Sequence, residues 1–196
     1  MPPYCHTRGV RRDLGVPDEV PLILFAGRFA PQKNVGTLIH ALAQLKARHP
    51  FSALIVGQGP DAAAMRELVD QSGLEEMVHF SDFREDLWAL MKVARVVVSP
   101  SRFEGHPNVV LEAIACRTPV IISDIPEHRE FLDESCAELV PPEDVAGLAA
   151  AMGRVLADPE ASRERALRAH SRIAGLSVEA AVEAYDAVYR RIVRKL

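Results

Sequence analysis

Short apolar runs and longer helical patterns alternate along this chain. Residues 22–26 form a continuous apolar run that stops at a glycine, which predicts a strand buried on both faces. Residues 35–48 repeat their large apolar side chains at helical spacing and predict an amphipathic helix. The same alternation predicts further strands at 51–56, 77–80, 93–98, 119–122 and 137–140, and further helices at 61–72, 86–93, 107–117, 145–157, 159–171 and 177–193.

This order of elements predicts one fold class. Strands that are apolar on both faces and alternate with helices are typical of a parallel sheet covered on both sides. Right-handed crossovers then give a doubly wound, Rossmann-like α/β domain with helices on both faces, which we expect to span residues 21–196. Residues 1–20 are polar and irregular apart from a short helix predicted near 10–14, and we expect them to be the remnant of a linker.

Composition excludes several classes of protein. The chain has 196 residues, of which 48% are hydrophobic, and a net charge of −4, whereas a nucleic-acid-binding domain would be basic. The apolar runs are too short to span a bilayer, and no apolar signal segment begins the sequence. Its three cysteines and seven histidines show neither a disulfide framework nor metal-ligand spacing. We therefore expect a cytoplasmic protein without a bound metal.

The loop between the strand at 93–98 and the next helix has the strongest chemical pattern. We place Pro107 at the first helical position, where its missing N–H costs nothing. The loop then leaves free N–H groups and the positive end of the helix available to a phosphate. Glu104 in the loop and Glu112 within the helix can accept hydrogen bonds from sugar hydroxyls on either side. Each also fits a plain role, Glu112 as a solvated residue and Glu104 as a partner of the helix dipole.

Two other loops carry candidate binding residues. Arg28 and Lys33 follow the first strand, where two cations can neutralise a diphosphate, although basic loop residues are commonly only solvated. In the loop at 81–86, Phe83 and Arg84 can hold a nucleobase by stacking and backbone hydrogen bonds. The competing interpretation is that this loop only caps the next helix through a side chain near its start.

A glycine-rich turn supports a different function. The segment G-Q-G-P-D-A at 57–62 resembles the dinucleotide-binding fingerprint, and an acid, Asp82, lies at the end of the next strand. This pattern would suit a nicotinamide-dependent oxidoreductase. However, Pro60 enters at the start of the helix, and the motif follows the second strand instead of the first. A plain tight turn explains the glycines equally well.

Four segments in order give a more specific resemblance. They are F-A-G-R-F-A-P-Q-K-N, L-I-V-G-Q-G-P, V-H-F-S-D-F-R-E-D and S-P-S-R-F-E-G-H-P-N-V-V-L-E-A-I-A-C-R-T-P-V. Together they resemble the C-terminal, donor-binding domain of GT-B fold glycosyltransferases in the large retaining family 4, also described as glycosyl transferases group 1. The spacing of Glu104 and Glu112 matches the E-x7-E signature of that family, and the resemblance covers residues 21–195.

The resemblance implies a role for each site residue. Arg28 and Lys33 would hold the donor diphosphate and stabilise the leaving nucleotide without a metal. Glu104 would contact the donor sugar and Glu112 the ribose hydroxyls. The resemblance also assigns donor binding to Gly27, Phe83, Arg84, Gly105, His106, Pro107, Asn108 and Val109. The reaction would transfer a hexose from a nucleoside-diphosphate sugar to a glycan or lipid-linked acceptor, with retention of anomeric configuration.

The sequence departs from the family pattern at several points. Arg117 and Asp82 stand where glycine is common, and Cys136–Ala137 replaces a usual Asn-Gly turn. The family's N-terminal acceptor domain is not in this sequence, so the helix at 177–193 would lack its partner there. We expect the isolated chain to bind nucleotide but to transfer little sugar. Peripheral membrane association through the acceptor domain and a purely nucleotide-binding, non-catalytic role both remain open.

Overall fold

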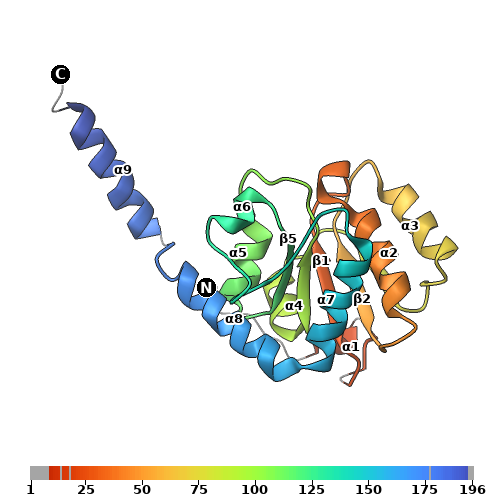
Figure 1. Ribbon diagram of the computed structural model, residues 1–196. Helices are drawn as coiled ribbons and strands as arrows, with labels where there is room; N and C mark the ends of the chain where they lie inside the picture. The colour runs from red at the N-terminus through yellow and green to blue at the C-terminus, as the bar shows by residue number, and fades with distance from the viewer. Residues whose placement is uncertain (1–8, 14, 18, 177, 194–196) are drawn as a thin grey trace.

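The computed structural model describes residues 9–13, 15–17, 19–176 and 178–193 (Figure 1). Its strands are β1 (Leu22–Ala26), β2 (Ser52–Val56), β3 (Val78–Ser81), β4 (Val96–Ser99), β5 (Val120–Ser123) and β6 (Glu138–Val140). Its helices are α1 (Val10–Asp13), the short 3-10 helix η1 (Pro31–Lys33), α2 (Val35–Leu45), α3 (Ala62–Gln71), α4 (Leu87–Val93), α5 (Asn108–Ala115), α6 (Pro126–Arg129), α7 (Val145–Ala157), α8 (Pro159–Ile173) and α9 (Val178–Val193).

The strands form one parallel sheet in the order β3-β2-β1-β4-β5-β6. The predicted Rossmann-like fold is therefore confirmed. The chain first builds outward from β1 to β3, then returns to the other side of β1 with β4. Neighbouring loops at the carboxyl ends of β1 and β4 consequently diverge, which is where ligands bind in open α/β sheets.

Helices cover both faces of the sheet, as predicted. Within β1, Ile23 and Phe25 belong to the core that packs under α2, α3 and α7. The intervening Leu22 and Leu24 point to the opposite core, under α4, α5 and α8. This period of two explains why β1 is apolar at every position, because each side chain is buried under one of the two helical layers. Figure 1 shows helices on both faces of the sheet.

Two predicted boundaries are wrong in detail, and one helix was not predicted. The strand expected at 93–98 begins at Val96, because α4 continues to Val93 and leaves two residues for the turn. Pro107 is the cap residue before α5, with φ −83° and ψ 62°, so the first helical residue is Asn108. The connection expected between β5 and β6 contains the short helix α6.

Part of the segment expected as a linker remnant packs against the domain. Val10 and Val16 are buried, and the Arg11 guanidinium donates hydrogen bonds to the carbonyl oxygens of Val93, Pro17 and Val20. Leu14, at the end of the predicted short helix, lies outside the described residues. At the other end of the chain, α9 extends away from the sheet (Figure 1). None of the described helices is long and apolar enough to cross a membrane.

Candidate functional site

An ion pair joins the loops that follow β1 and β4. Lys33 Nζ lies 2.7 Å from Glu104 Oε1 and 2.8 Å from Oε2, so both carboxylate oxygens accept hydrogen bonds. The Lys33 side chain is 22% exposed and that of Glu104 only 4%. The two residues were predicted as site residues from separate motifs, and the pairing of β1 with β4 brings them together at the point where the strand order reverses.

Asn34 fixes the loop that carries Lys33. Its backbone has a left-handed conformation (φ 53°), which asparagine tolerates better than most residues. Its side-chain amide donates to the carbonyl oxygens of Pro100, at 3.1 Å, and Pro142, at 2.7 Å. The Thr37 hydroxyl donates to Asn34 Oδ1 at 2.9 Å. Sequence reasoning missed Asn34, although an asparagine just before a helix is a recognisable signal.

Further hydrogen bonds join η1 to the loop that carries Glu104. The side-chain amide of Gln32 donates to the carbonyl oxygen of Phe103 at 2.9 Å, and the Arg102 N–H donates to the carbonyl oxygen of Gln32 at 2.9 Å. The Arg102 guanidinium also donates to the carbonyl oxygen of Pro31 at 2.8 Å. The Lys33–Glu104 pair therefore sits between two loops that are already held together by one main-chain hydrogen bond and two side-chain hydrogen bonds.

Helix α6 contacts the main chain at Glu104, an interaction that the sequence did not reveal. Glu127 Oε1 accepts a hydrogen bond from the Glu104 N–H at 3.3 Å. Beside it, His128 is completely buried, with Nδ1 2.8 Å from the carbonyl oxygen of Ser123. Because a carbonyl oxygen only accepts, Nδ1 carries the proton, and Nε2 has no hydrogen-bond partner among the described residues. Burial lowers the pKa of His128, although the hydrogen bond to Ser123 and the charges of Glu104 and Glu127 oppose that effect.

A cavity of about 320 Å³ lies at the carboxyl ends of β1 and β2, where Gly27, one of its lining residues, is next to the Lys33 side chain. It brings together five of the predicted donor-binding residues. Its lining consists of Ala26, Gly27, Arg28, Val56, Gly57, Gln58, Phe83, Arg84, Leu87 and Val109. Phe83 is 83% exposed, so its ring is available to a ligand.

The loop at 81–86 does not cap α4 as the competing interpretation proposed. Asp86 occupies the cap position of α4 without a side-chain capping bond. Its carboxylate instead accepts two hydrogen bonds of 2.7 Å from the Arg84 guanidinium. This pairing lowers the pKa of Asp86. Arg84 is therefore held at the edge of the cavity by its neighbour, with Phe83 beside it.

The remaining predicted residues lie in the loop before α5 and on α5 itself. Gly105, His106 and Asn108 are exposed, whereas Pro107 is buried. Glu112 is half-buried within α5, and burial raises the pKa of its carboxyl group. Across the described ranges, no cluster of three or more histidine, cysteine or acidic side chains is placed to hold a metal ion.

A sequence profile of known families decides what kind of protein carries this site. The profile described as "Glycosyl transferases group 1" matches residues 8–172. The chain belongs to the glycosyl transferases group 1 family.

Relatives in this glycosyltransferase family support the same assignment. An uncharacterised glycosyltransferase of Methanocaldococcus jannaschii is 35% identical over 151 residues, which cover 76% of this chain and 39% of the relative. The sucrose-phosphate synthase structure from Thermosynechococcus elongatus is 32% identical with a TM-score of 0.84, covering 96% of this chain and 49% of that one. The Anabaena HepE structure, solved with UDP and glucose, shares the fold at 24% identity and a TM-score of 0.85, covering 97% and 53%. The chain thus spans between 39% and 53% of the length of these three proteins.

The glycines that suggested a dinucleotide fingerprint have a packing explanation in this glycosyltransferase fold. A Cβ atom on Gly57 would lie 1.9 Å from the carbonyl oxygen of Gly27, and one on Gly59 would lie 2.2 Å from that of Phe29. The turn also follows β2, one strand away from the point where the strand order reverses. Both glycines are needed because two loops pack backbone to backbone, which favours the tight-turn interpretation.

One departure from the family pattern also has a structural explanation. Arg117 has φ 60°, a left-handed conformation in which a glycine would carry no strain. The N–H groups of Arg117 and Thr118 close the end of α5 by donating to the carbonyl oxygens of Ile114 and Ala113. The chain therefore adopts at Arg117 the turn that glycine usually makes. Cys136 and Ala137 are buried, and neither has a positive φ.

Proposed function

We propose that this chain is the donor-binding half of a retaining, GT-B fold glycosyltransferase of family 4. The enzyme would move a hexose from a nucleoside-diphosphate sugar to a glycan or lipid-linked acceptor. One observation carries the proposal: the Lys33–Glu104 pair lies where the strand order reverses, beside a cavity lined by Arg28 and the exposed Phe83. This combination offers cations for a diphosphate next to a surface on which a base can stack.

The charge arrangement suits departure of a nucleoside diphosphate. An ammonium group has three N–H donors, and Lys33 directs its donors at two carboxylate oxygens, which leaves capacity for one more acceptor. Glu104 would hold Lys33 in place while Lys33 and the exposed Arg28 bind the diphosphate. Both cations would then stabilise the negative charge that develops on the leaving group, with no metal required.

The neighbouring residues would recognise the rest of the donor. Phe83 and Arg84 would contact the base, with Leu87 and Val109 forming the apolar wall of the cavity. The N–H groups near the start of α5 would meet a phosphate, and the Glu112 carboxylate would accept hydrogen bonds from the ribose hydroxyls. In this assignment Glu104 would have two functions, because it would hold Lys33 in place and would also contact the donor sugar.

Acceptor binding would need a second domain. Helix α9 carries five large apolar side chains whose exposed fractions are 49% or more: Val182, Tyr185, Val188, Tyr189 and Ile192. We propose that this face packs against the acceptor domain of the whole enzyme. The chain by itself would then bind the donor with little transfer. The enzyme would act in the cytoplasm, and any contact with the membrane would come through the acceptor domain.

Calorimetric titration of the chain with UDP, GDP, ADP and NAD tests the proposal. We expect one nucleoside diphosphate to bind, with affinity lost in Arg28→Ala and Lys33→Ala and unchanged in Arg48→Ala, which removes an exposed cation elsewhere. Glu112→Ala should lose affinity for the ribonucleotide without unfolding. Preferential binding of NAD would support the oxidoreductase alternative instead, and failure to bind any nucleotide would contradict the claim that the chain alone holds the donor.

A further inference from the structure

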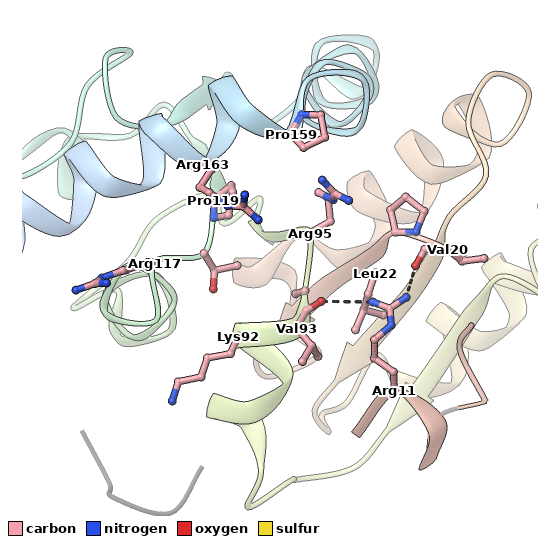
Figure 2. A pocket seen from close by; sticks show the side chains of 13 residues that line it. Arg11, Val20, Leu22, Lys92, Val93, Arg95, Arg117, Pro119, Pro159 and Arg163 are labelled. Carbon is pink, nitrogen blue, oxygen red and sulfur yellow. Dashed lines mark hydrogen bonds between the residues drawn. The ribbon is translucent and has the colours of Figure 1, made fainter. Parts of the chain in front are cut away.

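A second cavity, of about 340 Å³, lies at the amino ends of the strands, and Figure 2 shows the residues that line it. Leu22, Arg95 and Pro119 line it at the amino ends of β1, β4 and β5. The candidate donor site lies at the carboxyl ends of β1, β2 and β4. The two ends of β1, Leu22 and Ala26, are roughly 13 Å apart at a rise of about 3.3 Å per residue. The two cavities are therefore separate sites.

The charge of this second cavity is one-sided. Among the described residues that line it, none is acidic and five are basic: Arg11, Lys92, Arg95, Arg117 and Arg163. The whole chain, by contrast, has a net charge of −4. Like charges gathered around a cavity repel one another and raise the free energy of the fold unless something offsets them. The cluster therefore needs a reason beyond general solubility.

Helix ends and carbonyl groups explain three of these cations. Lys92 lies in the last turn of α4, and Arg117 follows the C-cap residue of α5, Cys116, so both lie where positive charge complements the helix dipole. Arg11 donates to main-chain carbonyl oxygens. In Figure 2, Lys92 and Arg117 extend away from the centre of the cavity.

Arg95 and Arg163 have no such explanation. The Arg95 side chain is half-buried and makes no hydrogen bond or ion pair with any described residue. Arg163 contacts Glu160 at 3.2 Å, a pair on one exposed helix turn with side chains 70% and 80% exposed. Figure 2 shows both guanidinium groups on the side of the cavity next to Pro159, the first residue of α8. The N-terminus of α8 adds partial positive charge there, although the Asp158 carboxylate caps it by accepting from the Ala161 N–H.

We propose that this cavity binds the phosphate group of a phosphorylated compound, held mainly by Arg95 and Arg163. Two guanidinium groups present planar pairs of N–H donors that match phosphate oxygens. The lining as described contains no aromatic side chain on which a nucleobase could stack. The ligand is therefore a phosphate ester or polyphosphate without a base, which distinguishes it from the sugar-nucleotide donor at the other edge.

Calorimetric titration of the full chain with inorganic pyrophosphate at physiological salt tests this proposal. We expect binding that weakens about tenfold or more in Arg163→Gln and further in Arg95→Gln/Arg163→Gln, because each change removes a charge-assisted contact. Arg163 is exposed, so its substitution should leave the fold intact even if the double variant is less stable. Arg48→Gln serves as the matched control and should bind like the parent chain.

A variant at the donor site separates the two cavities. Arg28→Gln should keep pyrophosphate binding at the second cavity. Arg95→Gln/Arg163→Gln should lose that binding. The proposal is overturned if Arg28→Gln abolishes all binding, if the Arg95 and Arg163 variants bind like the parent, or if pyrophosphate does not bind. If the parent chain binds no nucleoside diphosphate but still binds pyrophosphate at the second cavity, the proposed function is rejected and this inference stands.

The source of the phosphate group is distinguished by a parallel flotation assay. Vesicles of phosphatidylcholine are compared with and without phosphatidic acid. Flotation of the parent chain with phosphatidic acid, lost in Arg95→Gln/Arg163→Gln, would assign the phosphate to a lipid headgroup. Pyrophosphate binding without flotation would assign it to a soluble compound. Either result supports a phosphate site, because both depend on the same two arginines.

Discussion

Lys33 and Glu104 stand 71 residues apart in the chain, yet the lysine ammonium contacts both oxygens of a carboxylate whose side chain is only 4% exposed. A charge so well buried is costly unless it is paired and hydrogen-bonded. The pair therefore stabilises the junction of two loops and also orients the cation that we propose for catalysis. If the proposed function is correct, the same contact serves both the stability of this loop junction and the binding of the donor.

The energetic coupling of this pair can be measured with a double-mutant cycle. We expect Lys33→Met, Glu104→Gln and the double variant to give a coupling of about 1–2 kcal/mol in urea unfolding, below the full cost for buried pairs because Lys33 still reaches solvent. The same cycle on the exposed Glu160–Arg163 pair should give a coupling near zero. Equal coupling for the two pairs would show that Lys33 and Glu104 gain nothing from burial.

Two glycines, one in the loop after β2 and one in the loop after β4, should respond differently to replacement by alanine. A Cβ on Gly57 would lie 1.9 Å from a carbonyl oxygen at φ +147°, so Gly57→Ala should destabilise the fold by more than about 2 kcal/mol. Gly105 has open space around its would-be Cβ, so Gly105→Ala should change the free energy of unfolding by less than about 0.5 kcal/mol. Urea unfolding of both variants checks this. A tolerated Gly57→Ala would mean that the two loops do not pack as described.

Arg117 offers a stabilising substitution. Its φ of 60° costs a non-glycine residue about 1–2 kcal/mol, so Arg117→Gly should raise the free energy of unfolding by about 0.5–1 kcal/mol after the extra entropy of glycine in the unfolded chain is subtracted. Arg117→Ala is the matched control, because it removes the charge but keeps the strain. Thermal unfolding distinguishes the two. A gain for alanine as large as that for glycine would assign the effect to charge.

His128 should make stability fall on acidification. Burial lowers its pKa in the folded protein below the ordinary 6.5, so the unfolded chain binds the proton more readily. The free energy of unfolding should therefore decrease as pH falls below about 6.5, by at most about 1.4 kcal/mol per pH unit, until the folded pKa is passed. His128→Asn, whose amide can still donate to the carbonyl oxygen of Ser123, should flatten this slope.

The control for this pH dependence is His40→Asn, at an exposed histidine of α2. Urea unfolding at several pH values between 7.5 and 5 gives the slope for each protein. Because other titrating groups are common to all three chains, only the difference between slopes is assigned to His128. Identical slopes in the parent and in His128→Asn would show that the buried imidazole does not contribute.

Local patterns were sufficient for most of the fold. The apolar run at Leu22–Ala26 and the helical spacing of α2 and α7 report burial directly, because every strand position packs under one helical layer and every helix presents one apolar face. Boundaries near turns were less certain. Val93 and Val96 belong to the same apolar run, and only the end of α4 separates them.

The sequence predicted which residues belong to the candidate site, and the structure showed which of them contact one another. Sequence motifs named Arg28, Lys33 and Glu104, but no local pattern shows that Lys33 and Glu104 contact each other. Asn34 and His128 escaped notice because their partners lie in other loops: Pro100 and Pro142 for the asparagine, and the end of β5 for the histidine. Such contacts depend on strand order, which is a property of the whole sheet.

By itself, then, the sequence determined the alternation of strands and helices, the Rossmann-like class and the family resemblance, because hydrophobic period and motif spacing are local properties of the chain. Tertiary structure alone decided which loops meet, why Gly57 must be a glycine, and that Arg95 and Arg163 line a cavity at the far edge of the sheet. Those outcomes follow from packing between segments distant in sequence, where distance, burial and charge are set only after the sheet has assembled.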